Sequence, residues 1–398
     1  MQFLASAQAL FVGLRERESY HEALQVPPQK KAKLLEAQRA IRQAIRESAG
    51  RIRTEDGFWD HSFATHQTHR VRPDVMPKFF TQGSVAYDLL INPAHKPLQQ
   101  LDLDDGMYVG VDYLKNGQPV LIAKALFRLV EDAVAPLCAE RGWTLDKTKE
   151  TCVRIKLDNE SHIDIPIYSA PRDRMIAMDS LALQARADAV IKKAGGHEYL
   201  LLPSHQVMLA HRRGTWDQSD PLALSEWVDG SAERYGVLFR RSCRYVKGWR
   251  DHRWPESCLT SITIMAAIVE VLEDMNGNHR DLDDDRLVYE IARRLPSVFE
   301  KEICNPAFPD RSKILNEWST EERREIVGAA QVFAEHMHSA LKGTAVAELV
   351  VTSLRQIFGD RIPYRPDAVK IIPNVAATVA AEAAVTVPAP RVTSSTSG

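Results

Sequence analysis

Two aspartates spaced one residue apart, Asp102 and Asp104, lie in the segment LDLDD, whose alternation is typical of a β-strand. Strand residues point alternately to opposite faces, so both carboxylates would share one face. Carboxylates held side by side are costly unless a cation lies between them. Hard oxygen ligands suit Mg²⁺, which usually takes one or two carboxylates together with substrate phosphates. The segment therefore predicts a strand with a metal-binding face, although D-x-D is also common in solvated loops and at strand edges.

A glycine-serine pair, Gly83-Ser84, precedes this segment. A turn of this kind offers backbone N–H groups and a hydroxyl to phosphate oxygens. By itself the pair indicates only a turn. Together with the two acids, it favours metal-assisted phosphoryl or nucleotidyl transfer.

A third acid lies on a predicted β-hairpin. Residues 153–157 and 162–168 form two short β-runs, joined by the polar turn 158–161. Asp164 stands among β-branched residues of the second run, where burial is costly without a partner or a metal. A half-exposed strand with Asp164 facing water is the alternative.

The order G-S-x-x-Y, QQ-x-D-x-D-D-G-x-Y and H-I-D-I-P-I-Y resembles the cGAS/DncV-like nucleotidyltransferases (CD-NTases) of bacterial CBASS anti-phage systems, in particular the DncV-like branch. The similarity extends from about residue 75 to about residue 320. It implies a DNA-polymerase-β-like core that holds two Mg²⁺ ions, with Mn²⁺ as the alternative ion. The catalytic and metal-binding acids would be Asp102, Asp104 and Asp164, and Gly83 and Ser84 would contact the donor triphosphate.

Asp105 matches the family aspartate that is not a ligand. Strand alternation also turns it away from Asp102 and Asp104. Both arguments exclude it from the metal site.

The resemblance implies further nucleotide contacts. Lys247 and Ser261 match the family's triphosphate clamp, although the basic stripe of Arg240, Arg244 and Lys247 is equally typical of a solvated helix face. Arg154 matches an arginine near the nucleotide, or is a solubilising charge on a strand edge.

Three other positions match less closely. Tyr87 corresponds to a tyrosine near the donor base, or is a core aromatic. Gln82 would contact a nucleotide, or only ends its strand. Asp310 stands in a loop punctuated by prolines, near the place of a base-reading acid.

Composition fits a cytoplasmic enzyme. The net charge is −2 with 26% charged residues, so no global field would recruit nucleic acid or membrane. The five cysteines are scattered and never in C-x-x-C spacing, which predicts a reducing compartment with neither disulfides nor zinc. Because the resemblance associates DNA sensing with a zinc-binding insertion, we expect no DNA gating. No signal peptide or membrane-spanning run is apparent.

The expected fold class is α+β, a nucleotidyltransferase core with a mixed sheet and a helical second lobe. We expect N-terminal helices with a spine helix over 1–50, the catalytic core over 51–200, the helical lobe over 201–374 and a flexible tail over 375–398. Within these domains, helical periodicity predicts the following helices: 3–14, 34–45, 120–140, 234–250, 257–275, 284–296, 319–341 and 344–357. No GxGxxG or Walker sequence is present, which excludes the Rossmann and P-loop folds.

The resemblance implies that ATP and GTP are joined into cyclic GMP–AMP, a second messenger for anti-phage defence that reaches its effector by diffusion. Another cyclic di- or oligonucleotide is the nearest alternative. A nucleotidyltransferase acting on RNA or a small molecule, and a catalytically dead nucleotide sensor, are others.

The tail contains small residues, prolines and a Ser/Thr-rich end, with too little apolar bulk to offset its ordering entropy. A featureless extension is one interpretation. The other follows from the resemblance, because a ubiquitin-transfer-like enzyme conjugates such synthases through their C-terminal carboxylate. Gly398 would be the conjugated residue.

Overall fold

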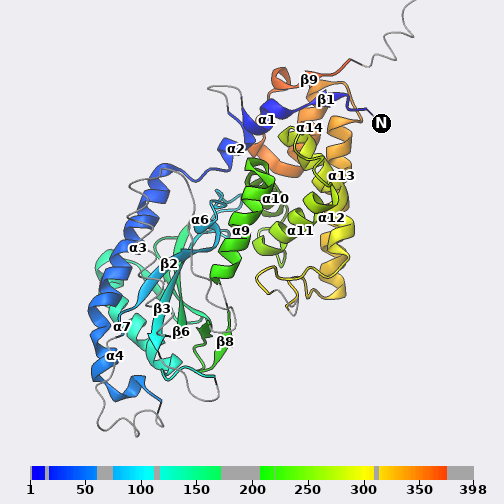
Figure 1. Cartoon of the computed structure of the whole chain (residues 1–398). Helices are drawn as coiled ribbons and strands as arrows, with labels where there is room; N and C mark the ends of the chain where they lie inside the picture. Colours follow the sequence, from blue (N-terminus) through cyan, green and yellow to red (C-terminus); the bar gives the residue numbers. More distant parts are fainter. Residues whose placement is uncertain are drawn as a thin grey trace, which may run out of the picture.

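A computed structural model describes residues 2–13, 18–60, 75–111, 117–171, 207–219, 221–308 and 313–373. Asp310 and the tail from residue 374 lie outside these ranges. The described chain forms a lobe built on a β-sheet and a helical lobe (Figure 1). All five cysteines are free.

The sheet is mixed and seven-stranded in the described part of the chain. Its strands are β2 (Lys78–Gln82), β3 (Leu101–Val111), β4 (Thr144–Asp146), β5 (Cys152–Lys156), β6 (Ser161–Pro171), β7 (Met208–Ala210) and β8 (Trp216–Gln218). The main order is β2-β3-β6-β5-β4, and β7 pairs with both β6 and β8. Among these seven described strands, only β3 and β6 are parallel neighbours. The hairpin of β5 and β6, the mixed sheet and the α+β class agree with the sequence-based predictions.

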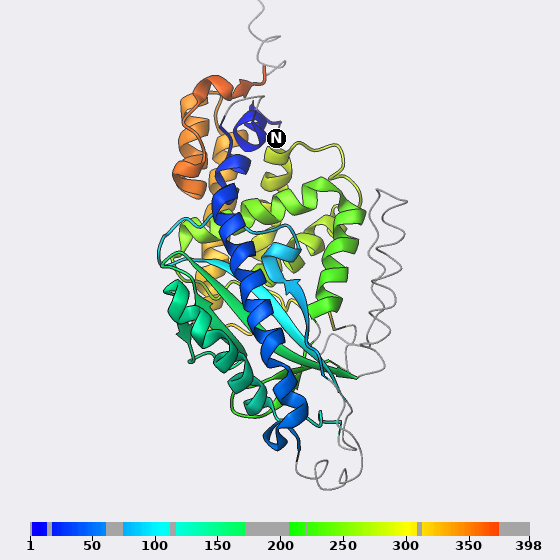
Figure 2. The same cartoon turned by 90° about the vertical axis from the view of Figure 1, so that its left-hand side faces the viewer.

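Two long helices cover one face of this sheet: α3 (Pro28–Ser48) and α7 (Ala123–Arg141). Figure 2 shows α3 lying along that face. Proline at the first turn favours the start of α3, whose apolar side chains recur at helical spacing. These side chains pack with alternate β3 and β6 residues such as Leu103 and Ile163 into one core. The opposite face of β3 is left for Asp102 and Asp104.

The helical lobe contains α9 (Pro221–Tyr235), α10 (Val237–Arg253), α11 (Ser261–Asp274), α12 (Asp284–Phe299), α13 (Thr320–Leu341) and α14 (Ala347–Phe358). These bounds match the predicted helices except at 234–250. That prediction runs across Gly236, whose φ of 72° ends α9 and separates it from α10. Residues 221–235 form a helix of their own, which the sequence analysis missed.

The N-terminal segment differs from its prediction. Residues 2–4 have no regular structure, Ala5–Ser6 form strand β1, and helix α1 covers only Gln8–Val12. The strand pairs with β9 (Lys370–Ile371), at the other end of the described chain. Because this pairing is non-local, helical periodicity could not reveal it. The short helices α2 (Tyr20–Ala23) and α4 (Gly50–Thr54) flank α3.

Two features bear on the predicted domains. The Ala7 N–H donates to Asp285 on α12 at 2.7 Å, so the first residues pack with the helical lobe rather than with α3. Strands β7 and β8 extend the sheet past residue 200, so the segment after that position is not wholly helical. The division into domains otherwise remains a prediction.

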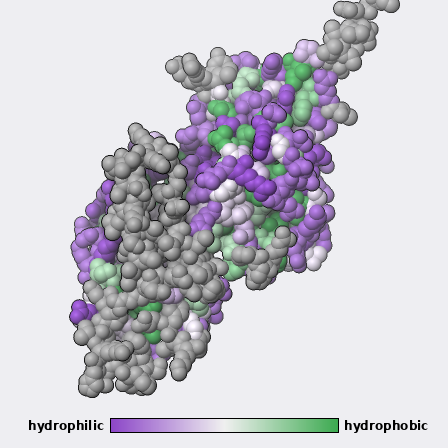
Figure 3. Space-filling view, in the orientation of Figure 1, coloured by the Kyte–Doolittle hydropathy of each residue, from purple (hydrophilic) through white to green (hydrophobic). Residues whose placement is uncertain are grey.

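Hydrophilic side chains dominate the face of the helical lobe seen in Figure 3, interrupted by smaller hydrophobic areas. None of the described helices has the length and apolar composition that crossing a bilayer requires.

Candidate active site

The register of the two parallel strands brings the predicted acids together. Asp104 on β3 lies opposite Asp164 on β6, and Asp102 lies opposite His162. Residues paired across neighbouring strands project to the same side of a sheet. The hydrophobic residues between them, Leu103 and Ile163, are completely buried on the other face. The three acids predicted from sequence therefore converge on one face, which we call the acid face.

The neighbouring Asp105 belongs to the opposite face. Its carboxylate is completely buried and accepts hydrogen bonds from Arg42 Nε at 2.7 Å and Gln38 Nε2 at 2.9 Å. Both donors stand on α3. Asp105 thus attaches α3 to the sheet, which agrees with its exclusion from the metal site.

Gly83 brings the glycine-serine turn against Asp104. It opens the short helix α6 (Gly83–Ala86) with φ +61°, a conformation that favours glycine. A Cβ atom at this position would overlap Asp104 Oδ2. Both the backbone conformation and the close approach require glycine. The glycine-serine turn is therefore in contact with Asp104, one of the two acids predicted from the D-x-D segment.

The negative charge of Asp104 on the acid face is only weakly compensated by a nearby cation. Burial raises the pKa of its carboxyl group to about 8, and the charges of Asp102 and Asp164 add to this effect. Arg154 acts in the opposite direction but more weakly. A carboxylate in this setting is stabilised more by binding a proton or a metal ion than by contact with water.

Arg154 holds Asp164 through a bidentate ion pair, with Nε–Oδ1 at 2.7 Å and Nη2–Oδ2 at 2.6 Å. This bond to Asp164 raises the pKa of the guanidinium group. The side chain of Arg154 is only 19% exposed, which excludes the interpretation as a solubilising charge on a strand edge. In this structure Arg154 orients the third acid, and its predicted contact with a nucleotide stays a prediction.

His162 belongs to the acid face but was missed in the sequence analysis. Its Nε2 lies 3.1 Å from Asp102 Oδ1. Asp102, His162 and Asp164 each offer one ligand atom, and these atoms lie within 4.8 Å of one another. The signal was present in H-I-D, because His162 precedes Asp164 by two residues and so shares its face. Within the described residues, the buried atoms Asp102 Oδ1 and His162 Nε2 have no hydrogen-bond partner, so the donor set fits a divalent cation.

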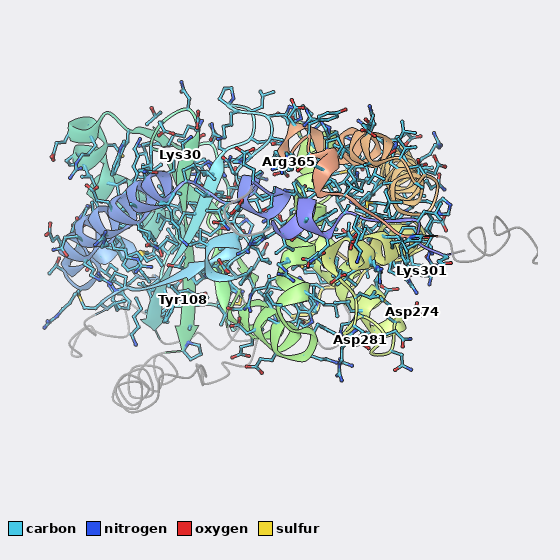
Figure 4. All side chains as sticks on the ribbon, turned by 90° about the horizontal axis from the view of Figure 1, so that it is seen from above. Lys30, Tyr108, Asp274, Asp281, Lys301 and Arg365 are labelled. Carbon is cyan, nitrogen blue, oxygen red and sulfur yellow. The ribbon has the colours of Figure 1, made fainter. Side chains whose placement is uncertain are left out.

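Gln82 lies on the acid face opposite Asp104 and is buried. Its Nε2 donates to the Tyr108 hydroxyl at 2.8 Å, and its Oε1 accepts from the Tyr168 hydroxyl at 3.3 Å. The two tyrosine rings stack with centroids 4.7 Å apart. Figure 4 places Tyr108 among the strands, far from the labelled Asp274 and Asp281 of the helical lobe. Gln82 is therefore fixed by two tyrosines, and its predicted contact with a nucleotide stays untested.

The basic stripe of α10 holds the turn that follows α6. Arg240 donates to the carbonyl oxygen of Tyr87 at 3.1 Å and Arg244 to that of Asp88 at 2.5 Å. Lys247 donates to the carbonyl oxygen of Leu89 at 2.6 Å. Burial lowers the pKa of the Lys247 ammonium to about 8. The stripe is thus not a solvated face, because it connects the helical lobe to the glycine-serine turn.

The remaining predicted residues lie in different settings. Tyr87 is buried in the core of the helical lobe, and this burial raises the pKa of its phenol, with the charge of Asp104 adding to the effect. Ser261 begins α11 and accepts from Arg250 Nη1 at 3.2 Å. Ser84 is half-buried and lines a small cavity with Lys31. Asp310 lies outside the described residues.

Comparison with known proteins agrees with this geometry. Residues 77–168 match the nucleotidyltransferase domain of the "Cyclic GMP-AMP synthase DncV-like" family. Residues 236–370 match the "Cyclic GMP-AMP synthase, C-terminal domain". The first match contains β2, β3, β5 and most of β6, and the second covers most of the helical lobe.

A cyclic GMP-AMP synthase from Escherichia coli is 35% identical over 250 residues, which cover 60% of this chain and 56% of that protein. One from Vibrio cholerae serotype O1 is 31% identical over 307 residues, which cover 72% of this chain and 68% of that protein.

Solved structures share the fold. The dinucleotide cyclase DncV of Vibrio cholerae, a variant in complex with ATP, GTP and 5MTHFGLU2, has a TM-score of 0.76 at 23% identity, covering 93% of this chain and all of that chain. DncV in complex with a linear intermediate has a TM-score of 0.74 at 23% identity, covering 94% of this chain and all of that chain. With the acids, the glycine turn and both domains in place, the chain belongs to the DncV-like family of nucleotidyltransferase enzymes.

Proposed function

We propose that this protein is a cyclic dinucleotide synthase that joins ATP and GTP into cyclic GMP–AMP with release of pyrophosphate. The observation that carries the proposal is the alignment of Asp104 with Asp164 on adjacent parallel strands, with the Gly83 backbone against Asp104. Relatives named cyclic GMP-AMP synthases support the product. A solved DncV structure with ATP and GTP supports the substrates.

The three acids of the acid face would hold two divalent cations, Mg²⁺ being the expected ion. Bound there, these cations supply charge neutralisation for the triphosphate and acidify the attacking hydroxyl. Asp104 meets the glycine-serine turn, and Asp102 and Asp104 would hold the ion of the donor triphosphate. All three acids, with Asp164 fixed by Arg154, would hold the ion at the acceptor hydroxyl. No side-chain nucleophile is needed, because positioning and electrostatics dominate phosphoryl transfer.

The reaction consists of two transfers of the same kind. A ribose hydroxyl of one nucleotide attacks the α-phosphorus of the other, forming a phosphodiester and expelling pyrophosphate. The linear product then turns over in the site, and its free hydroxyl attacks the remaining triphosphate to close the ring. A second pyrophosphate leaves.

The chain's own residues would hold the donor. Gly83 and Ser84 present backbone N–H groups and a hydroxyl, and Lys247 and Ser261 would add a charge and a second hydroxyl. For Lys247 this requires exchanging its bond to the Leu89 carbonyl for one to a phosphate. Base-proximal contacts are proposed for the following residues: Gln82, Tyr87, Arg154 and Asp310.

In the cell we propose that the product is a diffusible second messenger of anti-phage defence that acts on a separate effector. We also propose that a ubiquitin-transfer-like enzyme conjugates the chain through Gly398. No DNA gating is expected.

The test is thin-layer analysis of products made by the purified full-length chain from radiolabelled nucleoside triphosphates and Mg²⁺. The expected result is a phosphatase-resistant spot that requires both ATP and GTP and is absent from the Asp104→Ala variant. A cyclic trinucleotide or a pyrimidine-containing ring would refute the product. Label transferred only to RNA or to a small molecule, or no product under any condition, would refute cyclic dinucleotide synthesis itself.

A further inference from the structure

His162 is held at the acid face by contacts on both ring nitrogens. It is 6% exposed and stands opposite Asp102 in the β3–β6 register. Its Nδ1 lies 3.0 Å from Gln100 Oε1, and its Nε2 lies 3.1 Å from Asp102 Oδ1. The hydrogen bond to Gln100 restricts rotation of the ring.

The orientation of Gln100 determines the histidine tautomer. Gln100 Nε2 donates to the Asn159 carbonyl at 3.0 Å, so Oε1 is the atom that faces His162. An amide oxygen only accepts hydrogen bonds, and Nδ1 must therefore carry the proton. In the neutral ring, Nε2 then presents a lone pair to the Asp102 carboxylate.

Two acceptors at 3.1 Å repel each other unless something positive lies between them. Both atoms are buried, and neither has a hydrogen-bond partner in the described part of the chain. The contact is an ion pair only if the ring is doubly protonated. The alternative to that proton is a metal ion that both atoms bind.

We propose that His162 Nε2 is a ligand of a divalent cation shared with Asp102 and Asp164. This inference deepens the proposed function, because the cation is one of those that nucleotidyl transfer requires. Adjacent ligands at about 2.1 Å in an octahedral site lie about 3 Å apart, which matches the separation of Nε2 and Oδ1. The ligand atoms of all three residues lie within 4.8 Å of one another.

The contact of Nδ1 supports the same assignment. Metal-bound histidines usually donate their other ring N–H to a carbonyl or carboxylate, which fixes the tautomer. Here Gln100 accepts that bond and is itself fixed by Asn159.

A nitrogen ligand changes which cation the site prefers. Imidazole suits first-row transition ions better than Mg²⁺, which favours oxygen. The site is therefore selective for Mn²⁺ over Mg²⁺, relative to a site of three carboxylates.

The test uses the metal-stripped full-length chain loaded with Mn²⁺ without nucleotide. Pulsed electron paramagnetic resonance should detect ¹⁴N coupling to the bound ion, replaced by ¹⁵N coupling when histidine is isotopically labelled. The coupling should vanish in His162→Gln, and the Mn²⁺ dissociation constant should rise at least about tenfold. The Mg²⁺ constant should change less than about threefold.

His211→Gln is the matched control. His211 also contacts an aspartate, Asp217, through Nε2 at 2.9 Å, but on the β7–β8 hairpin. This variant should keep the ¹⁴N coupling and both dissociation constants. Loss of the coupling in His211→Gln would overturn the assignment.

Bound Mn²⁺ without histidine coupling would overturn the inference. The isotope experiment on the unsubstituted chain gives this answer even if His162→Gln fails to fold. Nucleotide synthesis in Mg²⁺ is measured separately. Synthesis without nitrogen coupling refutes this inference alone, whereas nitrogen coupling without synthesis refutes the proposed function alone.

Discussion

Asp104 and Asp105 are neighbours in sequence, yet they serve opposite faces of the same strand. Asp105 is completely buried and is neutralised by Arg42, with Gln38 as a second donor. Asp104 meets the Gly83 backbone and the charges of two further aspartates. Asp104 is itself only half-buried. The distinction is whether the protein supplies a compensating cation.

The two faces use charge differently. On the helix-covered face, the pair of Asp105 and Arg42 connects α3 to the sheet. On the acid face, Arg154 compensates only Asp164. The excess negative charge favours the binding of a divalent cation. While the ion is absent, the repulsion between the carboxylates lowers the stability of the fold.

The largest expected effect comes from Asp104→Ala. Synthesis should fall at least about a thousandfold, because charge stabilisation at a developing transition state is lost. The melting temperature of the metal-free chain should stay equal or rise, since repulsion is relieved. Asp102→Ala should behave in the same way. Product analysis measures synthesis, and calorimetry on the metal-stripped proteins measures the melting temperature. A lower melting temperature for Asp104→Ala would refute the interpretation that the charge of Asp104 is uncompensated.

Asp164→Ala should also abolish synthesis but differ in stability. Sequence alone predicts no loss of stability for any of the three variants. The structure revises this for Asp164, because its removal leaves half-buried Arg154 without its bidentate partner. We expect a cost of about 1 to 3 kcal/mol in the free energy of unfolding. An unchanged value would indicate that Arg154 finds another partner.

On the other face, Asp105→Ala should lower the free energy of unfolding by about 3 to 5 kcal/mol, because Arg42 is left uncompensated beside the core. Replacing both residues, as Asp105→Leu with Arg42→Met, should recover a large part of that loss. Denaturant unfolding of the single and double variants measures the coupling. Additive losses in the double variant would show that the two charges act independently.

The raised pKa of Asp104 makes the metal-free chain sensitive to pH. Its folded pKa of about 8 exceeds the ordinary pKa of an aspartate, 3.8. Its contribution to stability is therefore complete below about pH 4 and is lost as pH rises through 8. We therefore expect the melting temperature of the Asp104→Asn variant, measured relative to that of the unsubstituted chain, to increase between pH 5 and pH 8.

The measurement compares the two melting temperatures at each pH because other groups also titrate between pH 5 and pH 8. Burial lowers the pKa of three histidines, so their contribution to the stability of the fold decreases as pH falls. These residues are His21, His252 and His279. Their contribution cancels in the comparison. Saturating Mn²⁺ should remove the pH dependence due to Asp104, and its persistence would contradict cation binding at this residue.

The local pattern of β3 was predictable from sequence. Period-two alternation places Asp102 with Asp104 and turns Asp105 away, whatever the partner strands are. The β-hairpin that carries Asp164 follows from two short apolar runs around a polar turn. Most helix bounds follow from periodicity, but the break at Gly236, helix α9 and the N-terminal segment do not.

Contacts between distant segments were not predictable in this way. The meeting of His162 with Asp102 depends on the register between β3 and β6, which are separated by α7 and two strands. Likewise, the basic stripe of α10 gives no sign that its targets are consecutive carbonyl groups at residues 87–89. Non-local pairing is fixed by tertiary packing rather than by local pattern.

The smallest expected effect concerns the tail, which lies outside the described residues. Every residue predicted to contact metal or nucleotide precedes the tail, and the tail has too little apolar bulk to offset its ordering entropy. Deletion of 380–398 should therefore leave synthesis by the purified enzyme within about twofold, a change in barrier under about 0.5 kcal/mol. The same deletion should remove the proposed covalent adduct with a ubiquitin-transfer-like partner, because the Gly398 carboxylate is lost. Immunoblots from cells expressing both proteins measure the adduct. A Gly398→Glu variant that still forms the adduct in full would refute conjugation through Gly398.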